Sequence, residues 1–318
     1  MILLTGGTGF IGNALIRHLT DLGYPVKLLL RPTKDSPNLP KGLPLDITVT
    51  SLNDEKGLRA ALRGVSVVFH LATAEALGRK AKLTEVDIEG TNALLEAANQ
   101  AKIDRLIYLS HLGADQASAY PLLKAKGVAE QSIKNSGVPY TIFRSGLTYG
   151  ERDHFTNSLA FLIKVSPYFV MLPEDGGSLL QPIWVEDLCA VLTGSLEIDQ
   201  TINSTIEIGG PEYLSFREIS EIIADRIGAR RQFINVSPVF LNILTELIEI
   251  IIPNFPTSVF WLDYLAANRT AQMDVLPRTF DIIPARLSQR LGYLEGKNFR
   301  KNWWRIIQKR KRTMIRWD

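Results

Sequence analysis

The chain has 318 residues, of which 46% are hydrophobic and 22% charged, with a net charge of +3 at pH 7. This length can bury a substantial core in one large or two smaller domains, and the small net charge favours no particular class of partner. The single cysteine, Cys189, excludes an internal disulfide framework and fits a reducing, cytoplasmic compartment. We expect no signal peptide, no metal site and no membrane-spanning helix, since no uncharged apolar run reaches about 18 residues.

Strand-like and helix-like patterns alternate through the first half of the chain. Such alternation predicts a parallel sheet covered by helices on both faces. Right-handed crossovers then give an α/β doubly wound, Rossmann-like fold, in which ligands bind at the carboxyl ends of the strands. The predicted strands are residues 1–4, 26–30, 46–50, 65–71, 105–109 and 140–144, and the predicted helices are 13–22, 55–62, 84–100 and 122–135.

A glycine-rich loop joins the first predicted strand to the first predicted helix. It reads Thr-Gly-Gly-Thr-Gly-Phe-Ile-Gly over residues 5–12. Gly6 permits a tight turn, Gly9 lets the backbone approach a pyrophosphate, and Gly12 lets the helix pack closely on the strand. The helix N-terminus offers free N–H groups and a partial positive charge to the phosphates. The loop therefore predicts a dinucleotide site.

The second predicted strand is followed by Arg31 and by no acidic residue. An Asp or Glu at this place usually binds the free ribose 2′-OH of NAD(H), whereas a guanidinium accommodates a 2′-phosphate. The sequence therefore predicts NADP(H) in preference to NAD(H), with a surface arginine at a strand end as the structural alternative.

Tyr120 and Lys124 follow the fifth predicted strand and are four residues apart, so both face one side of a helix. A nearby ammonium lowers the pKa of a phenol, which can then relay a proton to a carbonyl or from an alcohol. The pair predicts an acid/base site with Tyr120 as the proton carrier.

These motifs together resemble the extended or atypical short-chain dehydrogenases/reductases. Within that group the chain most resembles the branch of the NADPH-binding accessory subunit of respiratory complex I and its bacterial relatives. The resemblance covers about residues 1–225. It is carried by the glycine loop, by residues 70–72 and 87–92, by the Tyr120–Lys124 pair, and by residues 110–114, 181–188 and 208–212.

The resemblance implies a role for individual residues. Arg31 would hold the 2′-phosphate, Lys124 would bind the nicotinamide ribose, and Tyr120 would be the acid/base. Ser110 is the nearest candidate for a substrate-polarising hydroxyl, because Leu112 stands where active members usually have Ser or Thr. The implied cofactor contacts are Gly6, Thr8, Gly9, Phe10, Ile11, Gly12, Arg31, Ser51, Leu52, Leu71, Ala72, Thr73, Leu109, Ser110, Tyr120, Lys124 and Gly146.

The C-terminal third differs in character. We expect a Rossmann domain over residues 1–165, to which 182–210 return, a C-terminal substrate lobe over 211–296, and a basic tail over 297–318. Residues 239–252 are strongly apolar, which fits a substrate pocket, a membrane surface, a partner interface or simple packing. The tail has cations interleaved with tryptophans, a pattern that favours an anionic membrane surface over a solvated segment, and both over nucleic acid.

Two functions follow. The first is an NADP(H)-dependent oxidoreductase or epimerase/dehydratase, in which Tyr120 moves a proton and the substrate is hydrophobic or sugar-like. The second is a non-catalytic NADPH-binding subunit or assembly factor of a membrane-associated complex. For His111 a substrate ligand and a solvated loop residue are both open, and the place of His154 after the sixth predicted strand is only a hint of substrate contact. A homodimer is left open.

Overall fold

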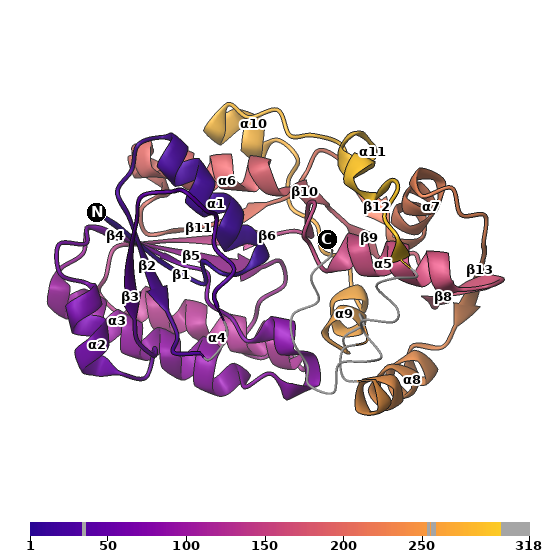
Figure 1. Cartoon of the computed structure of the whole chain (residues 1–318), viewed down its shortest axis with the longest axis horizontal. Helices are drawn as coiled ribbons and strands as arrows, with labels where there is room; N and C mark the ends of the chain where they lie inside the picture. The colour runs from indigo at the N-terminus through magenta and orange to yellow at the C-terminus, as the bar shows by residue number, and fades with distance from the viewer. Residues whose placement is uncertain (34–35, 253–254, 256–258, 300–318) are drawn as a thin grey trace.

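The computed structural model describes residues 1–33, 36–252, 255 and 259–299. Its centre is one sheet of seven parallel strands, in the order β11-β6-β5-β4-β1-β2-β3 (Figure 1). This order confirms the doubly wound Rossmann-like fold, whose direction of winding reverses between β1 and β4. The strands are β1 (Ile2–Thr5), β2 (Val26–Leu30), β3 (Leu45–Val49), β4 (Val67–His70), β5 (Arg105–His111), β6 (Tyr140–Ser145) and β11 (Ser204–Ile208).

Helices cover both faces of the sheet because alternate strand residues point to opposite sides. In β1, Ile2 and Leu4 pack in a cluster with α1 and α6, whereas Leu3 packs in a second cluster with α2, α3 and α4 (Figure 1). The helix predicted over 84–100 opens with a π-helical turn, Thr84–Glu89, before α3 begins. The bounds are α1 (Phe10–Asp21), α2 (Glu55–Ala61), α3 (Gly90–Ala101), α4 (Pro121–Asn135) and α6 (Val185–Gly194).

A smaller lobe is built around a third hydrophobic cluster, to which α5 and α7 contribute. Ser215 caps α7 and forms a capping box with Glu218, as its place in the sequence indicates. The helix α5 packs in this lobe, although the expected domain boundary at residue 165 assigns it to the first domain. The lobe contains α5 (Phe155–Val165), β8 (Phe169–Pro173), α7 (Phe216–Arg226), β13 (Gln232–Val236), α8 (Pro238–Ile251), α9 (Val259–Leu265) and α11 (Leu287–Arg290).

Short strand pairs join the two parts of the molecule. The pairs are β7 (Thr148–Tyr149) with β10 (Ile183–Trp184), and β9 (Leu179–Leu180) with β12 (Leu214–Ser215). A further helix, α10 (Val275–Phe280), returns to the sheet, where Leu276 packs in the cluster of α1 and α6. Within the described ranges no helix is both long and apolar enough to cross a bilayer. Residues 300–318, which carry most of the expected basic tail, lie outside the described residues.

Candidate functional site

The glycine loop lies between β1 and α1, at the carboxyl edge of the sheet. Gly6 has a φ of 75°, and a Cβ there would lie 2.6 Å from the carbonyl carbon of Leu71, so the turn requires glycine. A Cβ on Gly12 would overlap the carbonyl oxygen of Gly6. The first bond of α1 joins Asn13 N to Gly9 O (3.0 Å), which leaves the preceding N–H groups of the helix for a ligand. The loop therefore fits a pyrophosphate.

The carboxyl end of β4 lies beside this loop. The imidazole of His70 is fully buried between two hydroxyls, with Nδ1 2.7 Å from Thr5 Oγ1 and Nε2 2.9 Å from Thr91 Oγ1. Burial and the nearby charge of Lys126 lower the pKa of His70 to about 3, so the ring is neutral. Thr5 Oγ1 also accepts from Ala72 N at 3.3 Å, which fixes the loop after β4 against the glycine loop.

Arg31 is exposed and immediately follows β2, as the sequence predicts for a group that meets a 2′-phosphate. Sequence reasoning missed two further guanidinium groups close by. Arg17 Nη2 and Arg152 Nη1 both donate to Asn13 Oδ1, at 2.8 and 3.4 Å, and Asn13 Nδ2 donates to Asn38 O in the segment after β2. Arg152 comes from the loop before α5, so only the fold brings it to α1.

The other implied cofactor contacts lie along the same edge but differ in exposure. Leu71, Ala72 and Leu109 are half-buried, whereas Ser51 and Thr73 are exposed. Leu52 packs against the cluster of α2, α3 and α4, and Gly146 is buried, with its N–H bonded to Ile208 O. Thr8, Phe10 and Ile11, in the glycine loop, are half-buried. Their roles toward the cofactor stay predictions.

Tyr120 and Lys124 differ in their surroundings. Tyr120 is the half-buried N-cap residue of α4, and Lys124, one turn along, is exposed. The buried lysine of this helix is Lys126, whose Nζ lies 3.3 Å from Asp87 Oδ1 and 5.2 Å from the ring centre of Tyr108. Leu122, four residues before Lys126, is buried and apolar. The roles given to Tyr120 and Lys124 stay predictions. The four-residue spacing from Tyr120 did not identify Lys126, which is the buried cation of this helix.

Electrostatics keep Lys126 charged. Burial disfavours the ammonium, but Tyr108, Asp87 and Glu75 outweigh this cost and raise the pKa of Lys126 above its ordinary value. Burial in turn raises the pKa of Tyr108 to about 12, although the ammonium opposes the shift. Lys126 is thus a permanent positive charge close to the carboxyl ends of β4 and β5.

The hydroxyl of Ser110 is hydrogen-bonded inside the protein. Its side chain is almost completely buried, and its Oγ donates to Glu130 Oε1 at 2.6 Å. Glu130 is held on its other side by Arg144, with Nη2–Oε2 at 2.8 Å. The hydroxyl is therefore part of a buried network between β5, β6 and α4, and its catalytic role stays a prediction.

A second polar cluster lies where β5 meets the C-terminal lobe. His111 Nε2 is 3.0 Å from Glu75 Oε2, and the imidazole packs edge-on against Tyr264. Burial opposes the charge of Glu75, but His111, Lys126 and His154 outweigh it and lower the pKa of the carboxyl. Arg269, which is also buried, lies over the Tyr264 ring at 5.6 Å. His111 is therefore paired with a carboxylate rather than free in a solvated loop.

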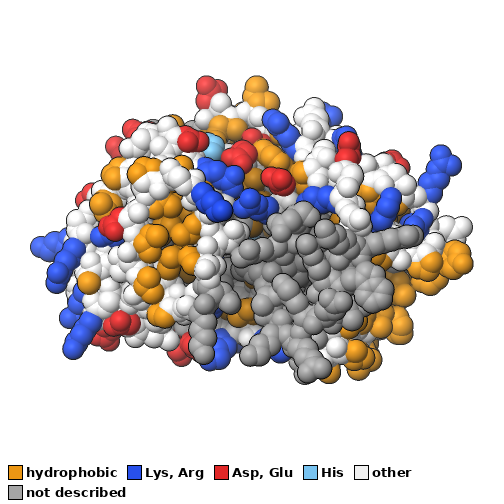
Figure 2. Space-filling model, in the orientation of Figure 1, with side chains coloured by type: hydrophobic (Ala, Val, Ile, Leu, Met, Phe, Trp, Pro, Cys, Tyr) orange, Lys and Arg blue, Asp and Glu red, His pale blue; other side chains and the backbone are white. Residues whose placement is uncertain are grey.

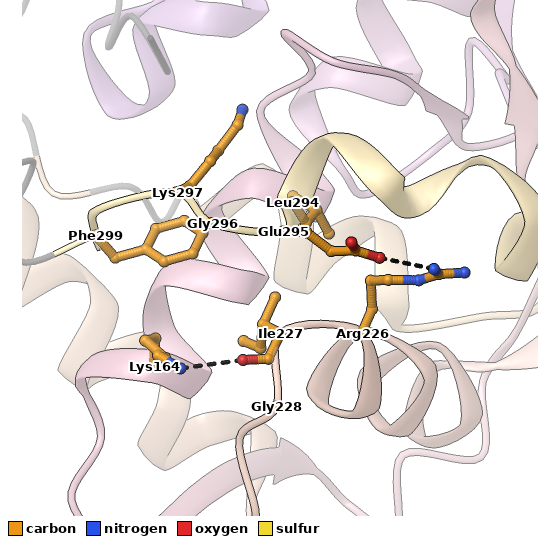
Figure 3. A pocket seen from close by; sticks show the side chains of 9 residues that line it. All are labelled: Lys164, Arg226, Ile227, Gly228, Leu294, Glu295, Gly296, Lys297 and Phe299. Atoms are coloured by element: carbon orange, nitrogen blue, oxygen red, sulfur yellow. Dashed lines mark hydrogen bonds and ion pairs between the residues drawn. The ribbon is translucent and has the colours of Figure 1, made fainter.

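A pocket of about 400 Å³ opens elsewhere, in the C-terminal lobe (Figure 3). Lys164 donates to Ile227 O at 3.0 Å on one wall, and Arg226 pairs with Glu295 at 2.8 Å on another. None of its lining residues belongs to the seven-stranded sheet. This pocket is therefore separate from the expected cofactor site.

Comparisons with known proteins agree with this geometry. Residues 6–157 match the family model for NAD(P)H-binding domains. The chain is 29% identical to subunit 9 of the NADH dehydrogenase 1 alpha subcomplex of Arabidopsis thaliana, over 70% of this chain and 56% of that protein. It is 34% identical to the photosystem II assembly factor Ycf39 of Cyanophora paradoxa, over 45% and 44%. The chain thus spans about half the length of these two curated relatives.

Solved structures share the fold across nearly the whole chain. The crystal structure of gox2253 superposes with a TM-score of 0.73 at 21% identity, covering 98% of this chain and 99% of that one. The structure of MoeE5 in complex with UDP-glucose and NAD gives 0.70 at 20%, covering 92% and 96%. Residues 6–157 are therefore similar to NAD(P)H-binding domains, and the chain as a whole shares the fold of these solved structures.

Proposed function

We propose that the protein binds NADP(H) at the β1–α1 loop and serves as an NADPH-binding subunit or assembly factor of a membrane-associated complex. The proposed cofactor binding rests on a glycine turn that a side chain would block, with the guanidinium group of Arg152 bonded to Asn13 of α1 and Arg31 exposed directly after β2. The glycine turn suits the pyrophosphate, and the guanidinium groups suit a 2′-phosphate.

The proposal that the protein is not a catalyst is supported by the residues of α4. Lys124 is exposed, and the buried Lys126 is preceded at the same spacing by Leu122, which has no proton to transfer. Ser110 is bonded to Glu130. Two curated relatives are named as a subunit of NADH dehydrogenase and as an assembly factor of photosystem II, which supports a role inside a complex.

An oxidoreductase or epimerase/dehydratase is the second candidate, favoured by the half-buried Tyr120 directly after the β5 loop. A bound nicotinamide would supply or accept hydride, and Tyr120 would hold or release the proton. The expected substrate is hydrophobic or sugar-like. Tyr120→Phe decides between the candidates: loss of function with the cofactor still bound indicates chemistry, and unchanged function with a stable complex indicates a scaffold.

The cofactor assignment is tested by titrating the protein with NADPH and with NADH and following energy transfer from tryptophan to the nicotinamide. We expect tighter binding of NADPH, and a loss of that preference in Arg31→Ala, because one charge partner of the 2′-phosphate is gone. Arg59→Ala is the matched control, since Arg59 is exposed on α2 and pairs with Glu55 in its own helix. Absence of binding by either nucleotide would refute the proposal.

A further inference from the structure

The helix α8 exposes an apolar face to solvent. Figure 2 shows hydrophobic side chains gathered at the lower right, where α8 lies in Figure 1. Their spacing of three to four residues places them on one side of the helix. The side chains are between 52% and 75% exposed and are Val239, Phe240, Ile243, Leu247, Ile250 and Ile251.

Few apolar side chains of the same helix are fully buried. The buried residues are Leu241, Thr245 and Glu249, of which only one is apolar. Leu244 and Ile248 are half-buried, so apolar residues lie on both sides of α8, whereas a helix that serves only the core of its own domain has a polar exposed side. The sequence of α8 is therefore suited to an apolar environment outside the protein, and six adjoining exposed side chains of this size mark an interaction surface.

The surroundings of α8 favour an anionic lipid surface as that environment. The preceding strand β13 follows Arg230 and Arg231, and Arg231 Nε donates to Ser166 O beside the exposed aromatic residues Tyr168 and Phe169. Aromatic and cationic side chains beside an apolar stripe are typical of the boundary between bilayer and water.

Charge in the sequence supports the same partner. Phe299, the last described residue, packs in the hydrophobic cluster that Ile252, at the end of α8, also joins. From Lys297 to Arg316 the sequence then has nine cations and no acid, and Trp303 and Trp304 lie among them. Cations close to an anionic bilayer are attracted to its negative surface potential.

We propose that α8 lies flat on an anionic membrane, with Val239, Ile243, Leu247 and Ile250 entering the boundary between headgroups and acyl chains. The proposal deepens the membrane-associated role under the proposed function and rests on it. It requires no contact with the nucleotide site.

Flotation of the full chain with vesicles tests the proposal. We expect the protein to float with vesicles that contain phosphatidylglycerol, and less with vesicles of phosphatidylcholine alone, and the difference should shrink at high salt. The double variant Ile243→Glu/Leu247→Glu should lower the partition coefficient at least tenfold, because two carboxylates replace apolar groups in the stripe. Ile283→Glu is the control, since Ile283 is 91% exposed outside α8.

NADPH binding and the circular-dichroism melting curve are measured on the same samples. If the double variant loses flotation while its NADPH binding and melting curve stay unchanged, the proposal is supported and the cofactor assignment is unaffected. If the wild type does not bind NADPH, this result counts against the cofactor assignment alone. Equal flotation of wild type and double variant overturns the proposal, as does absence of flotation by the wild type. A wild-type dimer that the double variant makes monomeric, without flotation, would assign the stripe to a second copy instead.

Discussion

Lys126 and Asp87 form an ion pair almost wholly out of water, with side chains 3% and 0% exposed. Such a pair adds little net stability, because desolvation consumes the attraction between the charges. Removing one partner is costly, however, since the other charge stays buried without compensation. The ring of Tyr108 contacts the same ammonium, so one residue of α4 joins β5 to the π-helical turn before α3.

Lys126→Met should therefore lower the free energy of unfolding by about 3 kcal/mol, the usual cost of breaking a buried pair. Lys124→Met, two residues away on the exposed side, should change it by less than about 0.5 kcal/mol. Urea unfolding followed by circular dichroism measures both. Equal changes in the free energy of unfolding of the two variants would show that the ion pair with Asp87 is not the cause of the loss.

Asp153 gives the stability of the protein a dependence on pH. Its carboxylate accepts hydrogen bonds from Gly150, Thr156 and Tyr293, yet burial outweighs them and raises its pKa from 3.8 to about 6. The folded state thus binds this proton more tightly than the unfolded state. The resulting stabilisation is complete below pH 3.8 and is lost as the pH rises through 6.

The wild type should accordingly lose about 3 kcal/mol of stability relative to Asp153→Asn between pH 4 and pH 7, an upper estimate from the size of the shift. Because the variant has no proton to release at this position, subtracting its unfolding free energy isolates the effect of Asp153. Denaturant unfolding at several pH values measures the difference. Two parallel curves would mean that the carboxyl titrates normally.

At the scale of elements, two glycines of the β1–α1 loop are expected to affect different properties: Gly9 the binding of the cofactor, and Gly12 the stability of the fold. A Cβ on Gly9 would meet only Gly6 O, at 3.2 Å, whereas a Cβ on Gly12 would overlap the backbone of Gly6 and Gly7. Gly9→Ala should weaken NADPH binding at least tenfold, because its methyl group enters the pyrophosphate space, with a small loss of stability. Gly12→Ala should lower stability itself by about 1–3 kcal/mol, the usual cost of overpacking. Titration and melting curves of both variants distinguish these effects.

Element types followed from the sequence where hydrophobic periodicity is strong. The six early strands came from this signal, although β4 is shorter than predicted and β5 extends two residues further, to His111. The loop before α1 came from its glycine pattern instead. The strands β7, β9, β10 and β12 have two residues each, too few to show a period, so nothing in the sequence marked them. The π-helical turn before α3 also lacks a sequence signature.

The site was harder to predict than the fold. The four-residue spacing selected Lys124, although the buried positions Leu122, Ala129 and Ile133 mark the inward side of α4, and Lys126 lies on it. Helical periodicity could therefore have identified Lys126. No local signal could have found Arg152 beside Asn13, because residues 139 positions apart meet only through the arrangement of the two lobes.

At the scale of the whole molecule, the nucleotide loop and α8 belong to different hydrophobic clusters. The loop stands on the cluster of α1 and α6, whereas Ile252, at the end of α8, packs in the cluster of α5 and α7. Much of α8 is not covered, and an element with few buried apolar contacts opens at low free energy. The two regions should therefore respond to different ligands.

Hydrogen exchange read by mass spectrometry tests this independence. NADPH should slow exchange in peptides that span the β1–α1 loop, because its phosphates accept from the free N–H groups of α1. Exchange in α8 should stay fast with NADPH and slow down only with phosphatidylglycerol vesicles, since its backbone then leaves water. Protection of α8 by NADPH alone would show instead that the lobes are coupled. In that case cofactor binding would regulate membrane attachment, and the two sites would have to be treated as one system.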